Sequence, residues 1–190
     1  MNYIQMIEAY QPDNEQEELE KKVTLDYIKL FHSNVLLRDN EIAHITSSGF
    51  IMNPTLDKVL LVHHNIRGVW SWTGGHADGD EDLLYVALKE AKEETGIINL
   101  QPLMEQIASI DILPVYGHTK NFKYVNGHLH LSIAFILIAA ETNEVHICAG
   151  ENSAVEWFGI DQITKEKFNE YDVYLYNKLI SRAHQYIKTR

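Results

Sequence analysis

The stretch Gly75–Ile97 reads GHADGDEDLLYVALKEAKEETGI, and the fold of the chain is inferred outward from it. We expect a helix from about Asp82 to Glu94, because acidic residues gather at its start, where capping and the helix dipole favour them. Gly96 follows the last helical residue, and glycine commonly stands just past the end of a helix. The stretch is therefore predicted to be a glycine turn leading into one amphipathic helix.

Three glutamates of this helix, Glu90, Glu93 and Glu94, share one arc about 100° wide when each residue advances by about 100°. The arc borders the apolar stripe, so the acids lie at the edge of the buried face. Glutamate-rich helix faces are often merely solvated. Here, however, crowded like charges would destabilise the helix, and a hard cation with oxygen ligands would remove that repulsion. With glycines on both sides, the pattern favours a site for Mg²⁺ or Mn²⁺.

The same stretch resembles the Nudix box, which is a glycine, five residues, a glutamate, seven residues, and then Arg-Glu-aliphatic-any-Glu-Glu-any-Gly-aliphatic. Eight of the nine defined positions match without a gap. The matching residues are Gly75, Glu81, Glu90, Ala91, Glu93, Glu94, Gly96 and Ile97. Lys89 stands at the ninth position in place of the arginine, where it keeps the charge but lacks the planar fork of the guanidinium. The chain is thus similar to the Nudix hydrolases.

The resemblance implies an α/β fold, an α/β/α sandwich with a mixed β-sheet. It also implies a divalent-metal-dependent hydrolase that cleaves a phosphoanhydride bond in a nucleoside diphosphate linked to another moiety, or in a similar small diphosphate compound. Glu90, Glu93 and Glu94 would bind Mg²⁺ or Mn²⁺, and the backbone carbonyl of Gly74 would be a further ligand. Lys89 would orient the neighbouring glutamate through a charged hydrogen bond.

The general base that activates water is not fixed by the resemblance. Glu90 inside the box is one candidate, and Glu151, just before a predicted strand, is the leading candidate outside it. Glu156 and Asp111 are weaker candidates. For any single acid outside the box, an ordinary surface position is the more common explanation, so Glu90 and Glu151 both stay open.

Aromatic and histidine side chains offer candidates for binding substrate. Trp70 and Trp72 lie on a strand that runs into the glycine turn. One face of this strand would point to the core, and an aromatic side chain on the other face could stack on a substrate base. His76 directly follows the turn and would lie near a bound phosphate. His128 and His130 share one strand face, but no third ligand for a transition metal is evident from spacing.

The rest of the chain predicts one domain with a helical extension. Residues 1–12 are expected to be loosely ordered, and an amphipathic helix or helical pair follows within a 1–40 accessory segment. A domain over 41–190 should contain several strands, a connecting loop at 114–127 that could act as a lid, and a closing helix over roughly 165–188. The accessory helix would cover the sheet, support a homodimer, or both.

Composition limits the possible partners. The net charge is −11, with 16 basic and 27 acidic residues, so sequence-independent binding to nucleic acid is not expected. No apolar run approaches the roughly 20 residues that span a bilayer, and the acidic start does not resemble a secretory signal. A single cysteine, Cys148, excludes an internal disulfide. We therefore expect a cytoplasmic protein without a membrane partner.

Two other functions remain to be weighed. Lys89 and the helical extension are compatible with a non-catalytic Nudix domain that senses a ligand, although a pure binder has little need of three intact glutamates. An isopentenyl diphosphate isomerase is disfavoured, because those enzymes use an active-site cysteine and Cys148 is distant in sequence. The sequence does not choose between oxidised nucleotides, nucleotide sugars, dinucleoside polyphosphates and non-nucleotide diphosphates.

Overall fold

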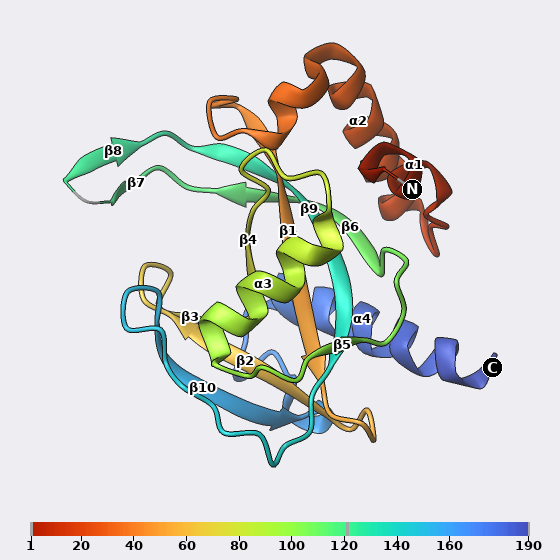
Figure 1. Ribbon diagram of the computed structural model, residues 1–190, viewed down its shortest axis with the longest axis vertical. Helices are drawn as coiled ribbons and strands as arrows, with labels where there is room; N and C mark the ends of the chain where they lie inside the picture. The colour runs from red at the N-terminus through yellow and green to blue at the C-terminus, as the bar shows by residue number, and fades with distance from the viewer. Residues whose placement is uncertain (1, 121, 190) are drawn as a thin grey trace.

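A mixed sheet of eight strands forms the centre of the computed structural model, which describes residues 2–120 and 122–189 (Figure 1). Five strands are hydrogen-bonded to their neighbours in the order β10-β2-β1-β9-β5. Each of the three remaining strands pairs with one of these five: β3 with β2, β4 with β1 and β6 with β9. The strands are β1 (Ala43–Met52), β2 (Lys58–His64), β3 (Val69–Ser71), β4 (Thr73–His76), β5 (Gln101–Pro102), β6 (Ser109–Val115), β9 (His128–Ile138) and β10 (Asn152–Gly159). The central pair, β1 and β9, is parallel, while the other pairs are antiparallel.

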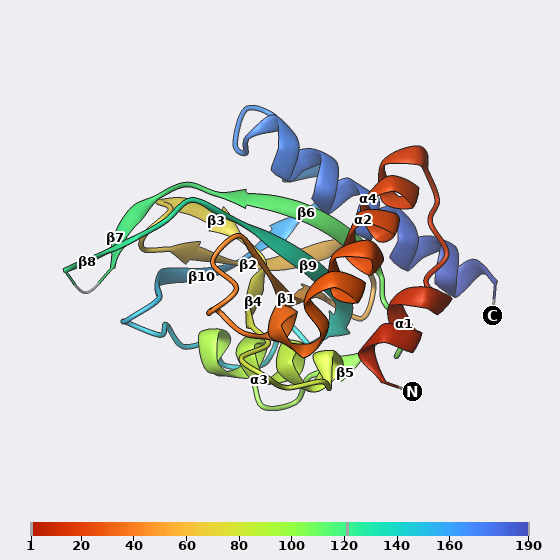
Figure 2. The same cartoon turned by 90° about the horizontal axis from the view of Figure 1, so that it is seen from above.

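Helices cover both faces of this sheet (Figure 2). Alternate residues of β1 point to opposite faces, so Ile45 and Ile51 enter the core beneath α3 (Leu83–Thr95). Phe50 and Met52 enter a second core beneath α4 (Glu170–Lys188). The expected α/β/α sandwich with a mixed sheet is therefore confirmed.

Helix α3 forms where the acidic motif predicts it, one residue later at each end. The Asp82 carboxylate accepts a hydrogen bond from the Tyr85 amide at 3.0 Å and caps the first turn. Gly96 takes a left-handed conformation with φ of 75° and ends the helix. Ala87 and Ala91 are fully buried against the sheet, and their small side chains bring the helix backbone close to it.

Residues 3–9 are helical, so the expectation of loose order over residues 1–12 is wrong for the part of that range that the structure describes, which begins at residue 2. Helix α1 (Tyr3–Ala9) begins with a capping box in which Asn2 and Gln5 exchange hydrogen bonds. Tyr3 and Ile7 lie in the same core as the inner residues of α3. Burial of these two apolar residues, which are four positions apart on one helix face, therefore stabilises a helix in a segment whose polar composition predicts disorder.

Helix α2 (Glu15–Phe31) and the short 3₁₀ helix η1 (His32–Leu36) complete the helical segment before the first strand. A buried charged cluster, made of Glu17, Asp111, Lys178 and Arg182, joins this segment to β6 and α4. The Lys178 Nζ lies 2.6 Å from Asp111 Oδ1 and 3.2 Å from Glu17 Oε1, while Arg182 Nη2 lies 3.0 Å from Glu17 Oε2. Both carboxylates are fully buried, so Asp111 is part of a structural ion cluster and not an accessible base.

The connection between β6 and β9 is a hairpin arm and not the expected loop. Strands β7 (His118–Lys120) and β8 (Lys123–Val125) pair with each other and extend away from the body of the molecule (Figure 1). Tyr116, Phe122 and Tyr124 are exposed on this arm. The sequence of this connection has no obvious periodic pattern, so the two strands were not predicted.

Candidate active site

The glycine turn and α3 meet because β4 pairs with β1 and α3 packs over both. Gly75 pairs with Ser47, and its α-carbon faces the carboxyl group of Glu90. A β-carbon added at Gly75 would lie 2.3 Å from the Glu90 carboxyl carbon, so a larger residue there would displace this carboxyl group. Glycine at this position therefore lets the Glu90 carboxyl group lie directly against β4.

Glu94 is the most buried acid of this site, with 5% of its surface exposed. The Gly74 amide donates a hydrogen bond to Glu94 Oε1 at 2.8 Å. Burial raises the pKa of Glu94 to about 8; the Gly74 hydrogen bond opposes that rise, while nearby carboxylates add to it. Glu94 is buried among other acids and away from water, so a cation bound beside it would strongly stabilise its ionised form.

The Gly74 carbonyl also points away from β1. In an antiparallel pair, a residue exchanges both of its backbone hydrogen bonds with its partner or neither. The Ala77 amide bonds to Ile45 at 3.1 Å, which makes odd-numbered β4 residues the bonded ones and leaves Gly74 unbonded to Ser48. The Gly74 amide and carbonyl are therefore both directed outward, on the side where Glu94 lies.

Glu90 and Glu93 complete the acidic arc. Burial, together with the charges of Glu93 and Glu151, raises the pKa of Glu90, although Lys89 opposes this rise. The side chain of Glu93 is 55% exposed. Lys89 Nζ lies 3.4 Å from Glu90 Oε1 and 4.0 Å from Glu93 Oε2, so it contacts both flanking acids from a half-exposed position.

Glu151 lies in a turn before β10 and is close enough to Glu90 and Glu94 to act on both electrostatically. Its position depends on Asn152, which sequence reasoning missed. The buried Asn152 amide donates to the Glu94 backbone carbonyl at 2.9 Å, and its oxygen accepts from the Cys148 amide at 3.1 Å. Asn152 thus ties the turn of Glu151 to the end of α3.

The two tryptophans lie on the α4 side of the sheet, so the expected division between a core face and a substrate face is not seen. Trp72 packs against Phe50 and Tyr176, with ring centroids 6.4 Å and 5.7 Å apart. Trp70 packs on Phe158 at 5.0 Å. Both are partly buried against the second core and are not grouped with the box glutamates.

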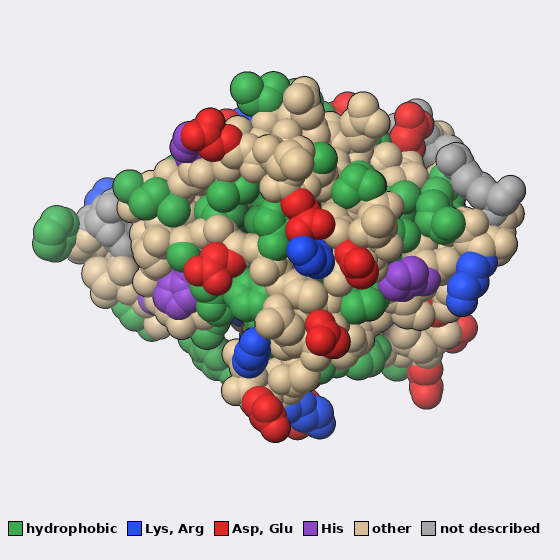
Figure 3. Space-filling view, turned by 90° about the horizontal axis from the view of Figure 1, so that it is seen from below, with side chains coloured by type: hydrophobic (Ala, Val, Ile, Leu, Met, Phe, Trp, Pro, Cys, Tyr) green, Lys and Arg blue, Asp and Glu red, His purple; other side chains and the backbone are tan. Residues whose placement is uncertain are grey.

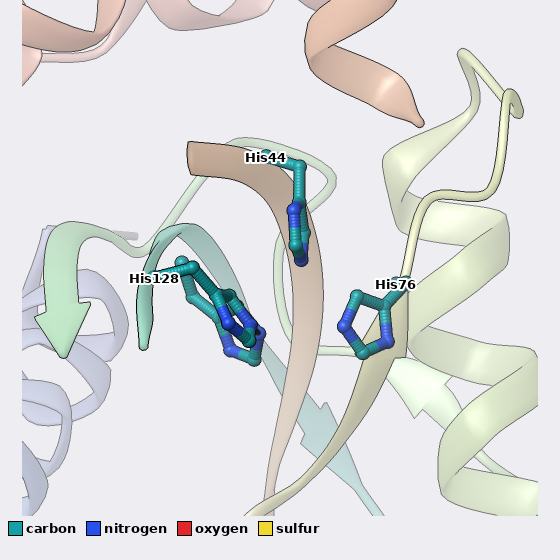
Figure 4. Close-up of side chains that lie close together, drawn as sticks. His44, His76 and His128 are labelled. Atoms are coloured by element: carbon teal, nitrogen blue, oxygen red, sulfur yellow. Dashed lines mark hydrogen bonds between the residues drawn. The ribbon is translucent and has the colours of Figure 1, made fainter. Parts of the chain in front are cut away.

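His76 also points away from the box. It follows Gly75 on β4, so its side chain leaves the opposite face of the strand from the one that contacts Glu90. There it joins His44, His128 and His130 in what we term the histidine cluster (Figure 4). Burial lowers the pKa of His76 to about 3 and that of His130 to about 2.

The histidine cluster supplies the partners that the sequence did not reveal for His128 and His130. His44 and His130 are register partners in the parallel pair of β1 and β9. No local spacing relates residues 44, 76 and 128, so only the strand order could have revealed the cluster.

Arg38 is a further residue that the motif does not contain. It makes a two-point ion pair with Asp78, at 2.7 Å and 2.6 Å. It is also close enough to Glu90 and Glu151 to interact with both electrostatically. Arg38 is therefore a cation beside the acidic site, held in place by Asp78.

On the face seen in Figure 3, lysine and arginine side chains lie apart from one another and do not form a continuous basic patch. Among the residues that the structure describes, no helix is long and apolar enough to cross a membrane.

Fold and site together define a class of protein, an α/β/α sandwich in which a glycine strand and an acidic helix face form a carboxylate site. A family model, described as the NUDIX domain, matches residues 43–179. The chain belongs to the Nudix hydrolase family.

Known proteins resemble the chain in sequence and in fold. The bis(5'-nucleosyl)-tetraphosphatase [asymmetrical] of Rattus norvegicus is 28% identical over 116 residues, which cover 58% of this chain and 69% of that protein. A NUDIX-family hydrolase from Clostridium perfringens has a TM-score of 0.50 at 20% identity, covering 73% of this chain and 97% of its own. An Ap4A hydrolase from C. elegans also has a TM-score of 0.50, at 15% identity, covering 77% and 98%. These two structures support the fold alone.

Proposed function

We propose that the chain hydrolyses a phosphoanhydride bond in a nucleoside diphosphate linked to another moiety, or in a similar small diphosphate compound. The observation that carries the proposal is the group of three glutamates, with Glu94 buried against the Gly74 amide and Glu90 lying in the space left by Gly75. Such crowding of carboxylates costs stability unless a cation binds them.

The residues fit a divalent metal ion, and we propose Glu90, Glu93, Glu94 and the Gly74 carbonyl as its ligands. All of these donors are oxygens, which suit Mg²⁺ or Mn²⁺. Such an ion would neutralise charge on phosphoryl oxygens and lower the pKa of a bound water. The protein would position the phosphates beside α3 and accept a proton from the attacking water on a carboxylate.

The substrate would be a small molecule with adjacent phosphates. The rat relative is named for a dinucleoside tetraphosphate, so dinucleoside polyphosphates are the first compounds to test. Nucleotide sugars, oxidised nucleotides and non-nucleotide diphosphates complete the panel. A screen with Mg²⁺ and with Mn²⁺, read out as released phosphate and as nucleoside monophosphate, would identify the bond that is cut.

The same screen separates hydrolysis from the alternative of a non-catalytic ligand sensor. A sensor would bind a member of the panel, detected as a thermal shift, without metal-dependent product release. Product release with either ion would exclude the sensor, whereas binding without turnover for every compound would contradict the proposed hydrolase.

The general base is proposed to be Glu90 or Glu151, and two glutamine variants distinguish them. If Glu151 activates water, Glu151→Gln should lower turnover by about 10²–10⁴-fold and leave Mg²⁺ affinity nearly unchanged. If Glu90 serves as ligand and base, Glu90→Gln should lower Mg²⁺ affinity and turnover together, with Glu151→Gln near wild type. We favour Glu90, because a rigid helix holds it. Wild-type behaviour of both variants would exclude both residues.

Lys89→Arg is expected to keep or raise the turnover rate. Lys89 makes single contacts with Glu90 and Glu93 at 3.4 Å and 4.0 Å, whereas a guanidinium can hold a carboxylate with two hydrogen bonds. Steady-state kinetics of the folded variant checks this. A severe drop in turnover, with an unchanged melting temperature, would show that the site is built specifically around lysine.

We also propose that 41–190 is the catalytic domain, that 1–40 is an accessory segment packed onto it, and that the protein acts in the cytoplasm.

A homodimer that forms through the 1–40 segment is a further proposal. Light scattering across a range of concentrations tests the dimer, and a constant monomer mass would exclude it.

A further inference from the structure

The histidine cluster lies where three neighbouring strands bring four imidazole rings onto one face of the sheet. The ligand atoms of His44, His76, His128 and His130 all lie within 4.8 Å of one another. His130 is the register partner of His44, and His76 pairs with Thr46, two residues further along the same face of β1. Figure 4 shows the rings of His44, His76 and His128 converging from these strands.

Backbone carbonyls fix the orientation of two of these rings. The Nδ1 of His44 lies 3.0 Å from the Asn40 carbonyl oxygen, and the Nδ1 of His128 lies 2.8 Å from that of Asn126. A carbonyl only accepts hydrogen bonds, so each ring donates from Nδ1 and presents an unprotonated Nε2 to the cluster. Metal-binding histidines are typically held in this way, because the second hydrogen bond sets the tautomer and the ring orientation.

The Nε2 of His44 is a buried acceptor that lacks a hydrogen-bond partner among the described residues. The residue is only 3% exposed. A buried polar atom without a partner is costly, and this atom faces the other three rings. A cation between the rings would satisfy it, whereas an additional apolar group would not.

We infer that the histidine cluster binds one divalent transition-metal ion, with Zn²⁺ as the first candidate. Imidazole nitrogen suits zinc, copper and nickel, while Mg²⁺ prefers oxygen ligands. Zinc–nitrogen bonds of about 2.0–2.1 Å place tetrahedral ligand atoms roughly 3.4 Å apart. The Nε2 atoms of His128 and His130 are already 3.2 Å apart, and modest side-chain rotation would bring in the others.

The charges around the cluster are compatible with a cation. Arg38 lies close enough to His44 and His76 to act on them, but its charge is balanced by the ion pair with Asp78. Arg67 has a weaker electrostatic effect on His130 than the three neighbouring histidines have. Four protein ligands would close the coordination shell, so this would be a structural site that joins β4 to β1 and to the base of the hairpin arm.

The test is metal binding by the full chain after treatment with a chelator. Excess Mg²⁺ is added first to occupy the proposed carboxylate site. Zn²⁺ is then titrated in the presence of a chromophoric chelator that competes for it. We expect one tightly bound Zn²⁺ per chain, and Co²⁺ in its place should give the intense visible absorption of tetrahedral coordination. His44→Gln and His130→Gln should weaken Zn²⁺ binding by more than roughly 100-fold, since even residues that only orient a ligand contribute 10–100-fold.

His184→Gln is the matched control, because His184 lies on α4 outside the cluster. It should bind Zn²⁺ like wild type. Equal Zn²⁺ affinity in wild type and both cluster variants would overturn the inference, and so would a Co²⁺ spectrum of octahedral oxygen ligation in wild type. The Co²⁺ spectrum is recorded on the wild-type protein, so it still tests the inference if a variant misfolds. Neither readout depends on hydrolysis.

Discussion

Glu94→Gln is expected to lower turnover by more than roughly 100-fold, which exceeds the usual cost of losing a residue that only orients a metal ligand. The amide oxygen of glutamine can still accept the Gly74 hydrogen bond at the position of Glu94 Oε1, so the fold should persist. What is lost is one ionisable carboxylate of the proposed metal site. Glu93→Gln removes a more exposed charge from the same arc and should also lower turnover by orders of magnitude. Steady-state kinetics over a range of Mg²⁺ concentrations measures both effects.

Glu105→Gln is a suitable control, because it removes an exposed glutamate outside α3. Its turnover should match wild type. Without metal, and above about pH 8 where Glu94 is ionised, the glutamine variants in the arc should unfold at the same or slightly higher denaturant concentration, because repulsion between neighbouring carboxylates decreases. Full turnover by Glu93→Gln or Glu94→Gln at saturating substrate and physiological Mg²⁺ would remove that residue from the proposed ligands.

Glu17→Gln is expected to lower the free energy of unfolding by about 3–5 kcal/mol, the usual cost of removing one partner from a buried ion pair. Glu17 is fully buried and contacts both Lys178 and Arg182. The neutral amide would therefore leave these two buried cations with one fully buried carboxylate, Asp111, instead of two. Such a loss is a large part of a typical total of about 5–15 kcal/mol. Urea unfolding measures it, and Glu18→Gln, at the exposed neighbouring position, should differ little from wild type.

The same comparison has a defined pH dependence. Burial would raise the pKa of Glu17, but the Asp13 amide, Lys178 and Arg182 together hold it below the ordinary value of 4.5. The carboxylate therefore stabilises the fold at and above that pH, and its contribution is lost as the pH falls through the lowered pKa. The stability difference between wild type and Glu17→Gln should narrow below about pH 4.5. A constant difference down to acid unfolding would contradict this role.

Local patterns predicted the parts of the fold that local interactions build. The cap at Asp82 and the left-handed Gly96 define α3 within one residue of its predicted ends. The grouping of Glu90 with Glu94 follows from helical spacing alone. Glu151 lies close enough to Glu90 and Glu94 to raise their pKa values, but its position depends on the hydrogen bonds of Asn152, which no spacing rule indicates.

Features that depend on pairing between distant strands were not predictable. His76 was expected near a bound phosphate because it adjoins the glycine turn in sequence, yet strand alternation directs it to the other face. The tryptophans, of which one face was expected to stack on a substrate base, both pack on the α4 side of the sheet. The histidine cluster arises from the register of β1 with β9. Likewise, the ion cluster of Glu17 forms only after α2, β6 and α4 have come together.

The parallel pairing of β1 with β9 also has a consequence for biosynthesis. Residue 43 pairs with residue 129 and residue 52 with residue 138, so β1 emerges from the ribosome long before its central partner. At roughly 5–20 residues per second, its apolar end waits several seconds, and such exposed strands are prone to aggregation. In contrast, β4 and α3 follow β1 closely in the chain. We therefore expect the carboxylate half of the molecule to assemble cotranslationally, as a partner that shields β1 until β9 is made.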